Sequence, residues 1–162
     1  MAVIPGDIKF FESNNGLGGA ITNNEIASSV LHNIFDGVSK EESQSGSVEY
    51  RCFYVKNTNG SSTFRGVLAY LLAQTTSPTT SLAFGLGTSA VGGTEQLLSD
   101  ESISPIGVSF VESIGETNGL LIGDIPAGSH KAIWLRRTVQ AGTTSASNDT
   151  ASMRFDGSTI ND

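Results

Sequence analysis

The 162-residue sequence has little cysteine, little charge and no long apolar run. Its single cysteine, Cys52, cannot form an intrachain disulfide, and its position in a strand-like pattern indicates a small buried hydrophobe. No stretch reaches the ~18 apolar residues of a membrane-spanning helix, so no membrane is expected as a partner. Residues 1–7 contain neither a basic region nor an apolar core, and we therefore predict no signal peptide and synthesis in the cytosol.

Basic residues are also few. Nine Lys and Arg stand against sixteen Asp and Glu, which gives a net charge of −7. Binding to nucleic acid needs clustered Lys and Arg that displace phosphate counterions, so nucleic acid is excluded as an expected partner. Charged residues make up 15% of the chain, and 19 glycines with many Ser, Thr and Asn take their place. This composition favours strands joined by turns over long helices.

Two runs in the first half have the pattern of long strands. Residues 48–57 alternate between apolar and polar side chains at first and become apolar on both parities later. Residues 64–74 are apolar on both parities, which is typical of a central strand buried on both faces. Asn59 and Gly60 lie between the runs and form a turn signal because both tolerate positive φ. We therefore predict a β-hairpin made of 48–57 and 64–74.

Six further segments show strand-like patterns. They are residues 7–12, 81–87, 105–111, 120–122, 130–139 and 149–156. About eight strands with turn signals between them and no alternating helices predict an all-β sandwich of antiparallel strands. Jelly-roll and immunoglobulin-like topologies both stay open. We predict one domain over residues 1–162, with its core in residues 7–156.

Residues 13–47 are the least strand-like part of the chain and are predicted as a loop-rich, irregular N-terminal excursion. Within it, Asn23 or Asn24 can cap a short helix that runs to Leu31, and residues 40–47 indicate a polar surface turn. A long segment without regular structure is usually functional or ordered by a partner. We therefore predict that the apolar residues of the excursion contact a partner. These residues are Leu17, Ile21, Ile26, Leu31 and Phe35.

No group of residues indicates catalysis or metal binding. His32 and His130 are far apart in sequence and, with one cysteine, too few for a zinc site unless carboxylates join; His130 is predicted to be solvated. The glycine-rich stretch 85–93 lacks the lysine of a phosphate-binding P-loop. No Gly-x-Ser-x-Gly elbow or Asp-x-Asp-x-Asp-Gly loop is present, although calcium held by scattered loop carboxylates stays open. We expect no enzyme activity and no cofactor.

Arg136 and Arg137 are neighbours in the last long predicted strand, where successive side chains point to opposite faces. One of them must therefore face the interior, a covered edge or a partner. An inward arginine needs a carboxylate, such as Asp149 or Asp156 on the next strand, or a subunit contact. Trp134 shares the parity of Arg136, so these two residues are predicted to form a patch of the kind enriched at protein interfaces.

Five stretches carry a resemblance to known proteins. They are 48–58 (VEYRCFYVKNT), 85–88 (GLGT), 92–95 (GGTE), 124–139 (DIPAGSHKAIWLRRTV) and 148–149 (ND). Together they resemble small virion structural proteins of tailed bacteriophages, over about residues 7–156. The resemblance implies a capsid decoration (cement) protein, bound to the major capsid protein on the capsid exterior. It also implies a β-sandwich or jelly-roll oligomer, with a homotrimer favoured, and no catalysis.

We therefore expect a structural virion protein, made in the bacterial host cytoplasm, that stabilises a phage capsid through protein–protein contacts. Two alternatives stay open. The first is a component of the phage tail or baseplate. The second is a carbohydrate-binding module for attachment to the host. Glycan sites usually present several exposed aromatic rings, and the predicted inward positions of Tyr50, Tyr54 and Tyr70 count against the second alternative.

Overall fold

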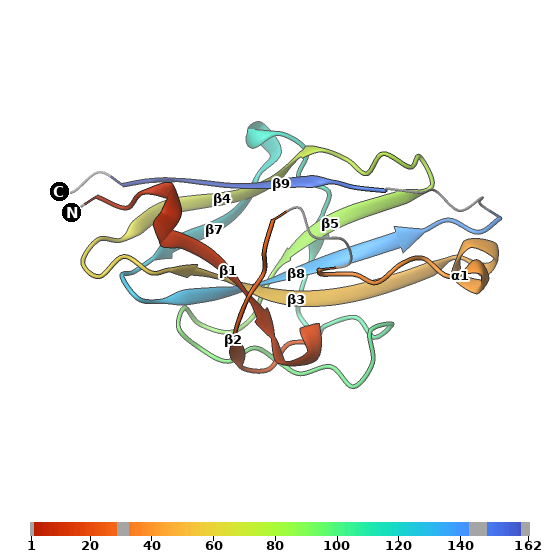
Figure 1. The fold of residues 1–162 in the computed structure, drawn as a ribbon, viewed down its shortest axis with the longest axis horizontal. Coiled ribbons are helices and arrows are strands. Elements are labelled where there is room, and N and C mark those ends of the chain that lie inside the picture. Colours follow the sequence, from red (N-terminus) through yellow and green to blue (C-terminus); the bar gives the residue numbers. More distant parts are fainter. Residues whose placement is uncertain (1, 29–32, 143–148, 160–162) are drawn as a thin grey trace.

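The computed structural model describes residues 2–28, 33–142 and 149–159, and this part of the chain forms an all-β sandwich, as predicted (Figure 1). A six-stranded sheet has the order β2-β1-β3-β8-β5-β6, and a three-stranded sheet has the order β7-β4-β9. The pairings between these strands are antiparallel. The strands are β1 (Ile8–Ser13), β2 (Ile21–Glu25), β3 (Ser47–Asn57), β4 (Phe64–Ala73), β5 (Thr80–Leu86), β6 (Phe110–Val111), β7 (Leu120–Ile125), β8 (His130–Val139) and β9 (Ser152–Ser158).

β3 and β4 do not form the predicted hairpin. β3 pairs with β1 and β8 in the large sheet, whereas β4 pairs with β7 and β9 in the small sheet, so the chain crosses between the layers. The fully buried side chain of Asn57 supports this crossing by donating to the carbonyls of Ser62 at 2.9 Å and Ile125 at 3.0 Å. Neither Asn59 nor Gly60 adopts positive φ. Because the asparagine amide satisfies these buried carbonyls, the connection does not need a tight hairpin turn.

The main core lies between the two sheets. Phe155 of β9 joins the layers, since its ring centroid lies 4.9 Å from that of Phe10, 6.0 Å from that of Phe53 and 6.2 Å from that of Phe84. β4 is the central strand of its sheet, but only its inward face is fully buried, because Leu72 is 56% exposed. Further core residues are Val55, Val67, Ala69, Leu71, Ile133 and Leu135.

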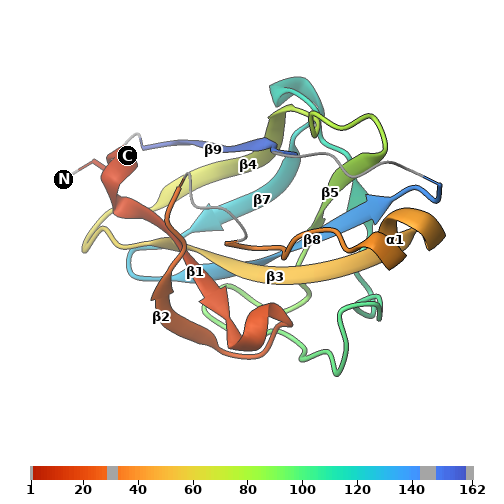
Figure 2. The same cartoon turned by 45° about the vertical axis from the view of Figure 1, so that its right-hand side comes forward.

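A second apolar cluster lies on the outer face of the large sheet. Cys52 and Tyr54 of β3 and Trp134 of β8 belong to it, and all three are at most 2% exposed. The loop 87–109, which follows β5, runs along this face and supplies Leu98 to the cluster (Figure 2). The large sheet is therefore covered on both faces, by the small sheet on one and by a loop on the other.

The predicted excursion is more regular than the sequence indicated. Where we predicted a helix starting at Asn23 or Asn24, residues Ile21–Glu25 form β2 and pair with β1 at the edge of the large sheet. The helix prediction is wrong there because pairing with β1 gives β2 backbone partners that a short isolated helix lacks at its ends. The rest of that predicted helix falls partly on residues 29–32, outside the described residues.

The predicted surface turn 40–47 contains a short helix, α1 (Lys40–Ser45). The Ser39 hydroxyl accepts a hydrogen bond from the backbone N–H of Glu42 at 3.2 Å, and the Glu42 carboxylate accepts one from the N–H of Ser39 at 2.5 Å. This reciprocal arrangement is a capping box, which satisfies two N–H groups at the start of the helix. The Ser-x-x-Glu spacing is present in the sequence, but a six-residue helix is too short to show an apolar helical period.

Candidate functional site

The candidate site is a set of exposed apolar side chains on loop 87–109. Ile106 is 84% exposed, the highest value among the large hydrophobic side chains that the structure describes. Leu97 is 59% exposed and Ile103 is 46% exposed. We call these three residues the apolar tip. Single exposed hydrophobic residues are ordinary on protein surfaces, so the local geometry must show whether the tip is a site.

The backbone of Ile106 is held by one side chain. The Gln96 amide nitrogen donates to the Ile106 carbonyl at 2.8 Å, and the Gln96 side-chain oxygen accepts from the Ile106 N–H, also at 2.8 Å. Both polar backbone groups of Ile106 are therefore occupied, as they would be in a strand. Gly107 follows with φ of +74°, which turns the chain away. The Ile106 side chain is thus displayed outward from a fixed backbone.

The base of the loop is held by buried charges. Lys131 is 7% exposed, and its ammonium group donates to the carbonyls of Gly87, at 2.9 Å, and Ser89. Glu95 is 3% exposed and accepts hydrogen bonds from the Ser89 N–H at 2.8 Å and the Thr88 hydroxyl at 2.9 Å. Burial opposes the charge of Glu95, but these hydrogen bonds outweigh it and lower its pKa to about 2. The glycine-rich stretch therefore folds around a lysine of its own chain.

The middle of the loop is joined to the β1–β2 connection. The Leu98 N–H donates to the Leu17 carbonyl at 2.8 Å, and the Tyr54 hydroxyl accepts from the backbone N–H of Glu95 at 3.0 Å. Gly18 packs directly against the loop with φ of +92°, and a Cβ there would lie 1.9 Å from the Gln96 carbonyl oxygen. Only glycine fits this contact, so the loop and the β1–β2 connection form one packed unit.

The predicted partner-contacting residues of the excursion pack within the chain. Leu17 and Ile21 are half-buried against the second cluster, beside loop 87–109. Ile26 and Phe35 are half-buried against the main core. Leu31 lies outside the described residues. Much of the apolar surface for which we predicted a partner is therefore covered by other residues of the same chain.

Trp134 and Arg136 do not form the predicted surface patch. Trp134 is 0% exposed, because the second cluster and loop 87–109 cover this face of the sheet. Arg136 is half-buried, and its guanidinium carbon lies 5.4 Å from the centroid of the Phe110 ring, a cation–π contact. The patch prediction is wrong because loop 87–109 covers this face of the sheet, and the alternation within β8 carries no information about that cover.

Arg137 is the inward arginine of the pair. It is 7% exposed and forms an ion pair with Glu49, which lies directly opposite it on β3. It also donates to the backbone carbonyl of Asp36 at 2.6 Å. The predicted internal pair is therefore present, but its carboxylate comes from β3 and not from Asp149 or Asp156. The sequence could not indicate that β3 is the neighbour of β8.

His130 is half-buried, whereas the sequence predicted a solvated side chain. Its Nε2 lies 3.2 Å from the Gly93 carbonyl oxygen, and its ring packs edge-on against Tyr54 at a centroid distance of 5.0 Å. Burial lowers the pKa of His130. His32 lies outside the described residues. Across ranges 2–28, 33–142 and 149–159, no three His, Cys, Asp or Glu side chains gather in a way that could hold a metal ion.

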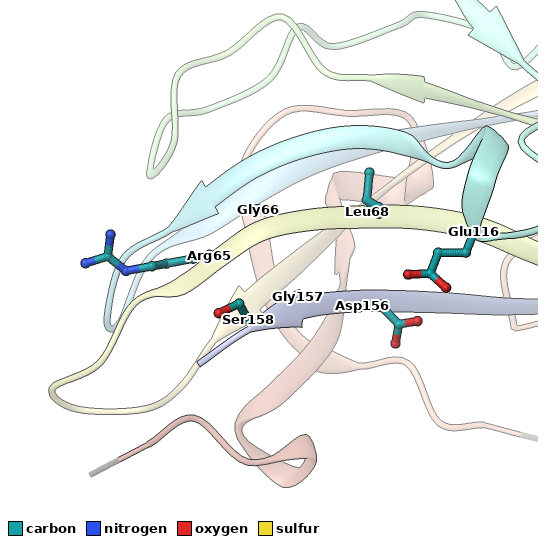
Figure 3. Close-up of a pocket in the computed structure, with 7 residues that line it drawn as sticks. All are labelled: Arg65, Gly66, Leu68, Glu116, Asp156, Gly157 and Ser158. Atoms are coloured by element: carbon teal, nitrogen blue, oxygen red, sulfur yellow. The ribbon is translucent and has the colours of Figure 1, made fainter. Parts of the chain in front are cut away.

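A groove of about 440 Å³ lies on the small sheet (Figure 3). The Glu116 and Asp156 carboxylates line it, but Asp156 already accepts hydrogen bonds from the Tyr70 hydroxyl at 2.5 Å and the Arg154 guanidinium at 2.9 Å. These bonds, that from Tyr70 first, lower the pKa of Asp156. The Asp156 carboxylate is therefore already held by two neighbouring side chains. Its lining residues are Arg65, Gly66, Leu68, Glu116, Asp156, Gly157 and Ser158.

Comparison with known proteins found no family model, no curated protein and no solved structure that matches this chain. The resemblance to phage virion proteins therefore stays a prediction. In the residues that the structure describes, no helix has the length and apolar character needed to cross a membrane.

Sequence reasoning missed Gln96 and Ile106. The pattern placed Ile106 in a strand over residues 105–111, whereas the strand observed there is β6 (Phe110–Val111) alone. The strand is shorter because a side chain, and not a neighbouring strand, satisfies the backbone of Ile106. A signal was available in Ile103 and Ile106, two large apolar residues on either side of a Ser-Pro turn signal.

Proposed function

We propose that this protein is a structural component of a tailed-bacteriophage virion, a capsid decoration protein that binds the major capsid protein from outside. The observation that carries the proposal is the apolar tip, and above all Ile106 with its backbone held by Gln96. An exposed apolar side chain on a fixed backbone is suited to enter a pocket on another protein, because little conformational entropy is lost on binding. The resemblance of stretches 48–58 and 124–139 to phage virion proteins supports the choice of partner.

The charges beside the tip indicate the chemistry of the pocket. Asp100 is exposed, and the Ser102 hydroxyl and N–H hold its carboxylate, at 2.5 and 2.8 Å. Glu101 next to it pairs with Arg51. An apolar pocket with a basic rim would therefore complement the tip, since opposite potentials across an interface speed association and select partners.

A carbohydrate-binding module fits the side chains less well. Tyr54 and Trp134 are 0% exposed and Tyr70 is 4% exposed. Tyr50 is half-buried, and its ring packs against Phe110 at a centroid distance of 5.3 Å. These aromatic rings are therefore packed against other residues of the chain and are not displayed for stacking on sugars. A tail or baseplate component would use the same tip, and co-sedimentation with shells and tails separates it from a capsid protein.

The test is co-sedimentation of purified protein with shells and tails of the phage that carries the gene, each stripped of this protein. We expect stoichiometric binding to shells that Ile106→Ser weakens by roughly 10- to 100-fold, the effect of losing one buried isoleucine. The matched control is Ile4→Ser, because Ile4 is 60% exposed and belongs to the N-terminal segment, which lies away from loop 87–109 (Figure 1).

Equal binding by wild type and Ile106→Ser would refute the role of the tip. Binding to tails and not to shells would assign the protein to the tail or baseplate. Binding to neither would refute the virion proposal itself.

A further inference from the structure

β9 is the last strand of the small sheet. Among the described residues it pairs with β4 alone, in the order β7-β4-β9, and it lies along the margin of the molecule in both views (Figures 1 and 2). An edge strand presents unpaired N–H and C=O groups to which another strand can add. Proteins protect such edges with proline, very short strands or charged side chains; β9 has seven residues and no proline, and Arg154 and Asp156 are the charges it carries. Residues Met153 to Gly157 form the central part of this edge.

The core is not closed beside β9. Phe155 points inward from this strand, yet it is only half-buried, and so is Phe10, whose ring centroid lies 4.9 Å away. Both rings therefore keep part of their apolar surface exposed at the margin of the sandwich. A strand added along β9 would continue the hydrogen bonding of the small sheet and cover this surface at the same time.

The charges of β9 identify what that strand can be. Arg154 and Asp156 lie on the outer face, where Arg154 is in register with Tyr70 of β4, and they pair with each other at 2.9 Å. Opposite charges placed directly across an antiparallel strand pair stabilise it, and like charges destabilise it. If a second β9 runs antiparallel about a two-fold axis at Phe155, each Arg154 lies opposite Asp156 of the other copy. The charges of β9 are thus complementary to those of a second β9 that runs in the opposite direction.

We propose that the free edge of β9 is a self-association surface through which two copies pair antiparallel about a two-fold axis at Phe155. The two small sheets then join into one continuous sheet, and the two Phe155 rings meet at the exposed margin of the two cores. Such a contact uses the same patch on both copies and closes at two, so it produces a dimer where the resemblance implied a trimer. The inference does not depend on the proposed function, since loop 87–109, which carries the apolar tip, lies on the opposite side of the molecule from β9 (Figure 2).

The experiment measures the mass of the full chain in solution by sedimentation equilibrium and native mass spectrometry. We expect wild type at twice the 16.9 kDa chain mass. Arg154→Asp and Asp156→Arg each place like charges opposite one another, and each is expected to be a monomer. An equimolar mixture of these two variants is expected to form a heterodimer, because the opposed charges are then complementary again. The double variant R154D/D156R is expected to form a homodimer for the same reason.

The matched control is Lys9→Asp, which makes the same change in charge as Arg154→Asp in an exposed ion pair, Lys9 with Glu25, of the other sheet. It is expected to leave the dimer intact. Recovery in the mixture also shows that the single variants fold, since misfolded chains would not pair. A wild type that is monomeric or trimeric at all concentrations, or a dimer that Arg154→Asp leaves unchanged, would overturn the proposal. Shell binding by the monomeric variants, measured separately, tests the function of the apolar tip.

Discussion

Glu49 on β3 and Arg137 on β8 lie opposite each other in register, and their side chains form an ion pair that is almost fully buried. The pair also holds part of the excursion, because Arg137 donates to the Asp36 carbonyl at 2.6 Å and lies 4.8 Å from the centroid of the Phe35 ring. Burial, followed by the neighbouring Glu42 carboxyl, raises the pKa of Glu49 to about 7. The contacts of Arg137 and Glu49 therefore link the large sheet to the excursion, including α1.

Replacing the cation of this pair is expected to be strongly destabilising. Arg137→Met leaves Glu49 buried without its partner and releases Asp36, which we expect to lower the free energy of unfolding by about 3–5 kcal/mol. Urea unfolding measures the change. Lys9→Met is the control, because Lys9 and Glu25 form an exposed pair whose loss should change stability by no more than about 1 kcal/mol. Equal effects of the two substitutions would contradict a structural role for the buried pair.

The raised pKa of Glu49 predicts a pH dependence. Arg137 favours the charged carboxylate of Glu49, but burial opposes that charge more strongly and raises the pKa. The contribution of Glu49 to stability is therefore complete below the ordinary pKa near 4.5 and is lost as the pH rises through about 7. Glu49→Gln is neutral at every pH and should not lose this contribution. Wild type should therefore become less stable relative to Glu49→Gln as the pH rises from about 5 to 8.

Unfolding curves of both proteins at several pH values give this difference. The lowered pKa of His130 acts in the opposite direction, since its contribution is lost as the pH falls, but it is common to both proteins and cancels in the comparison. A difference in stability that stays constant with pH would show that Glu49 titrates normally.

Gly18 and Gly60 give a matched pair of substitutions. A methyl group at Gly18 would meet the Gln96 carbonyl oxygen at 1.9 Å, at a φ of +92°, so Gly18→Ala should destabilise the protein by at least about 2 kcal/mol. A methyl group at Gly60 would have no atom within 4 Å, and Gly60 has no positive φ, so Gly60→Ala should be neutral or stabilising by up to about 1 kcal/mol. Thermal unfolding measures both, and similar melting temperatures would contradict the packing of the loop on the β1–β2 connection.

Trp134 is the single tryptophan and reports on the cover of loop 87–109. Because it is 0% exposed, its emission should be shifted to the blue and resist quenching by iodide. Lys131→Met removes the donor to the Gly87 and Ser89 carbonyls, which should lower stability by about 1–3 kcal/mol and move the emission toward the red. Lys9→Met should leave the spectrum unchanged. A spectrum of Lys131→Met identical to wild type would show that Lys131 does not hold the loop.

The positions of the strands could be predicted because alternation is a local property of the chain. β8 (His130–Val139) begins and ends at the predicted residues, and β3 and β4 differ from their predicted ranges by one residue each. Side-chain direction has a period of two in any strand, whatever it pairs with, so a run of residues carries this information by itself. The same local rule required one of Arg136 and Arg137 to face the interior, a covered edge or a partner, and in the structure Arg137 faces the interior.

The sequence by itself thus determined the all-β class, most strand positions and the requirement that one of two neighbouring arginines be covered. Only the tertiary structure decided that β3 and β4 belong to different sheets, that Glu49 is the partner of Arg137, 88 residues away, and that a loop buries Trp134. Strand partners and loop cover depend on contacts between segments far apart in the chain, and no local period encodes them. The fixed backbone of Ile106 likewise depends on a contact with the side chain of Gln96, ten residues away.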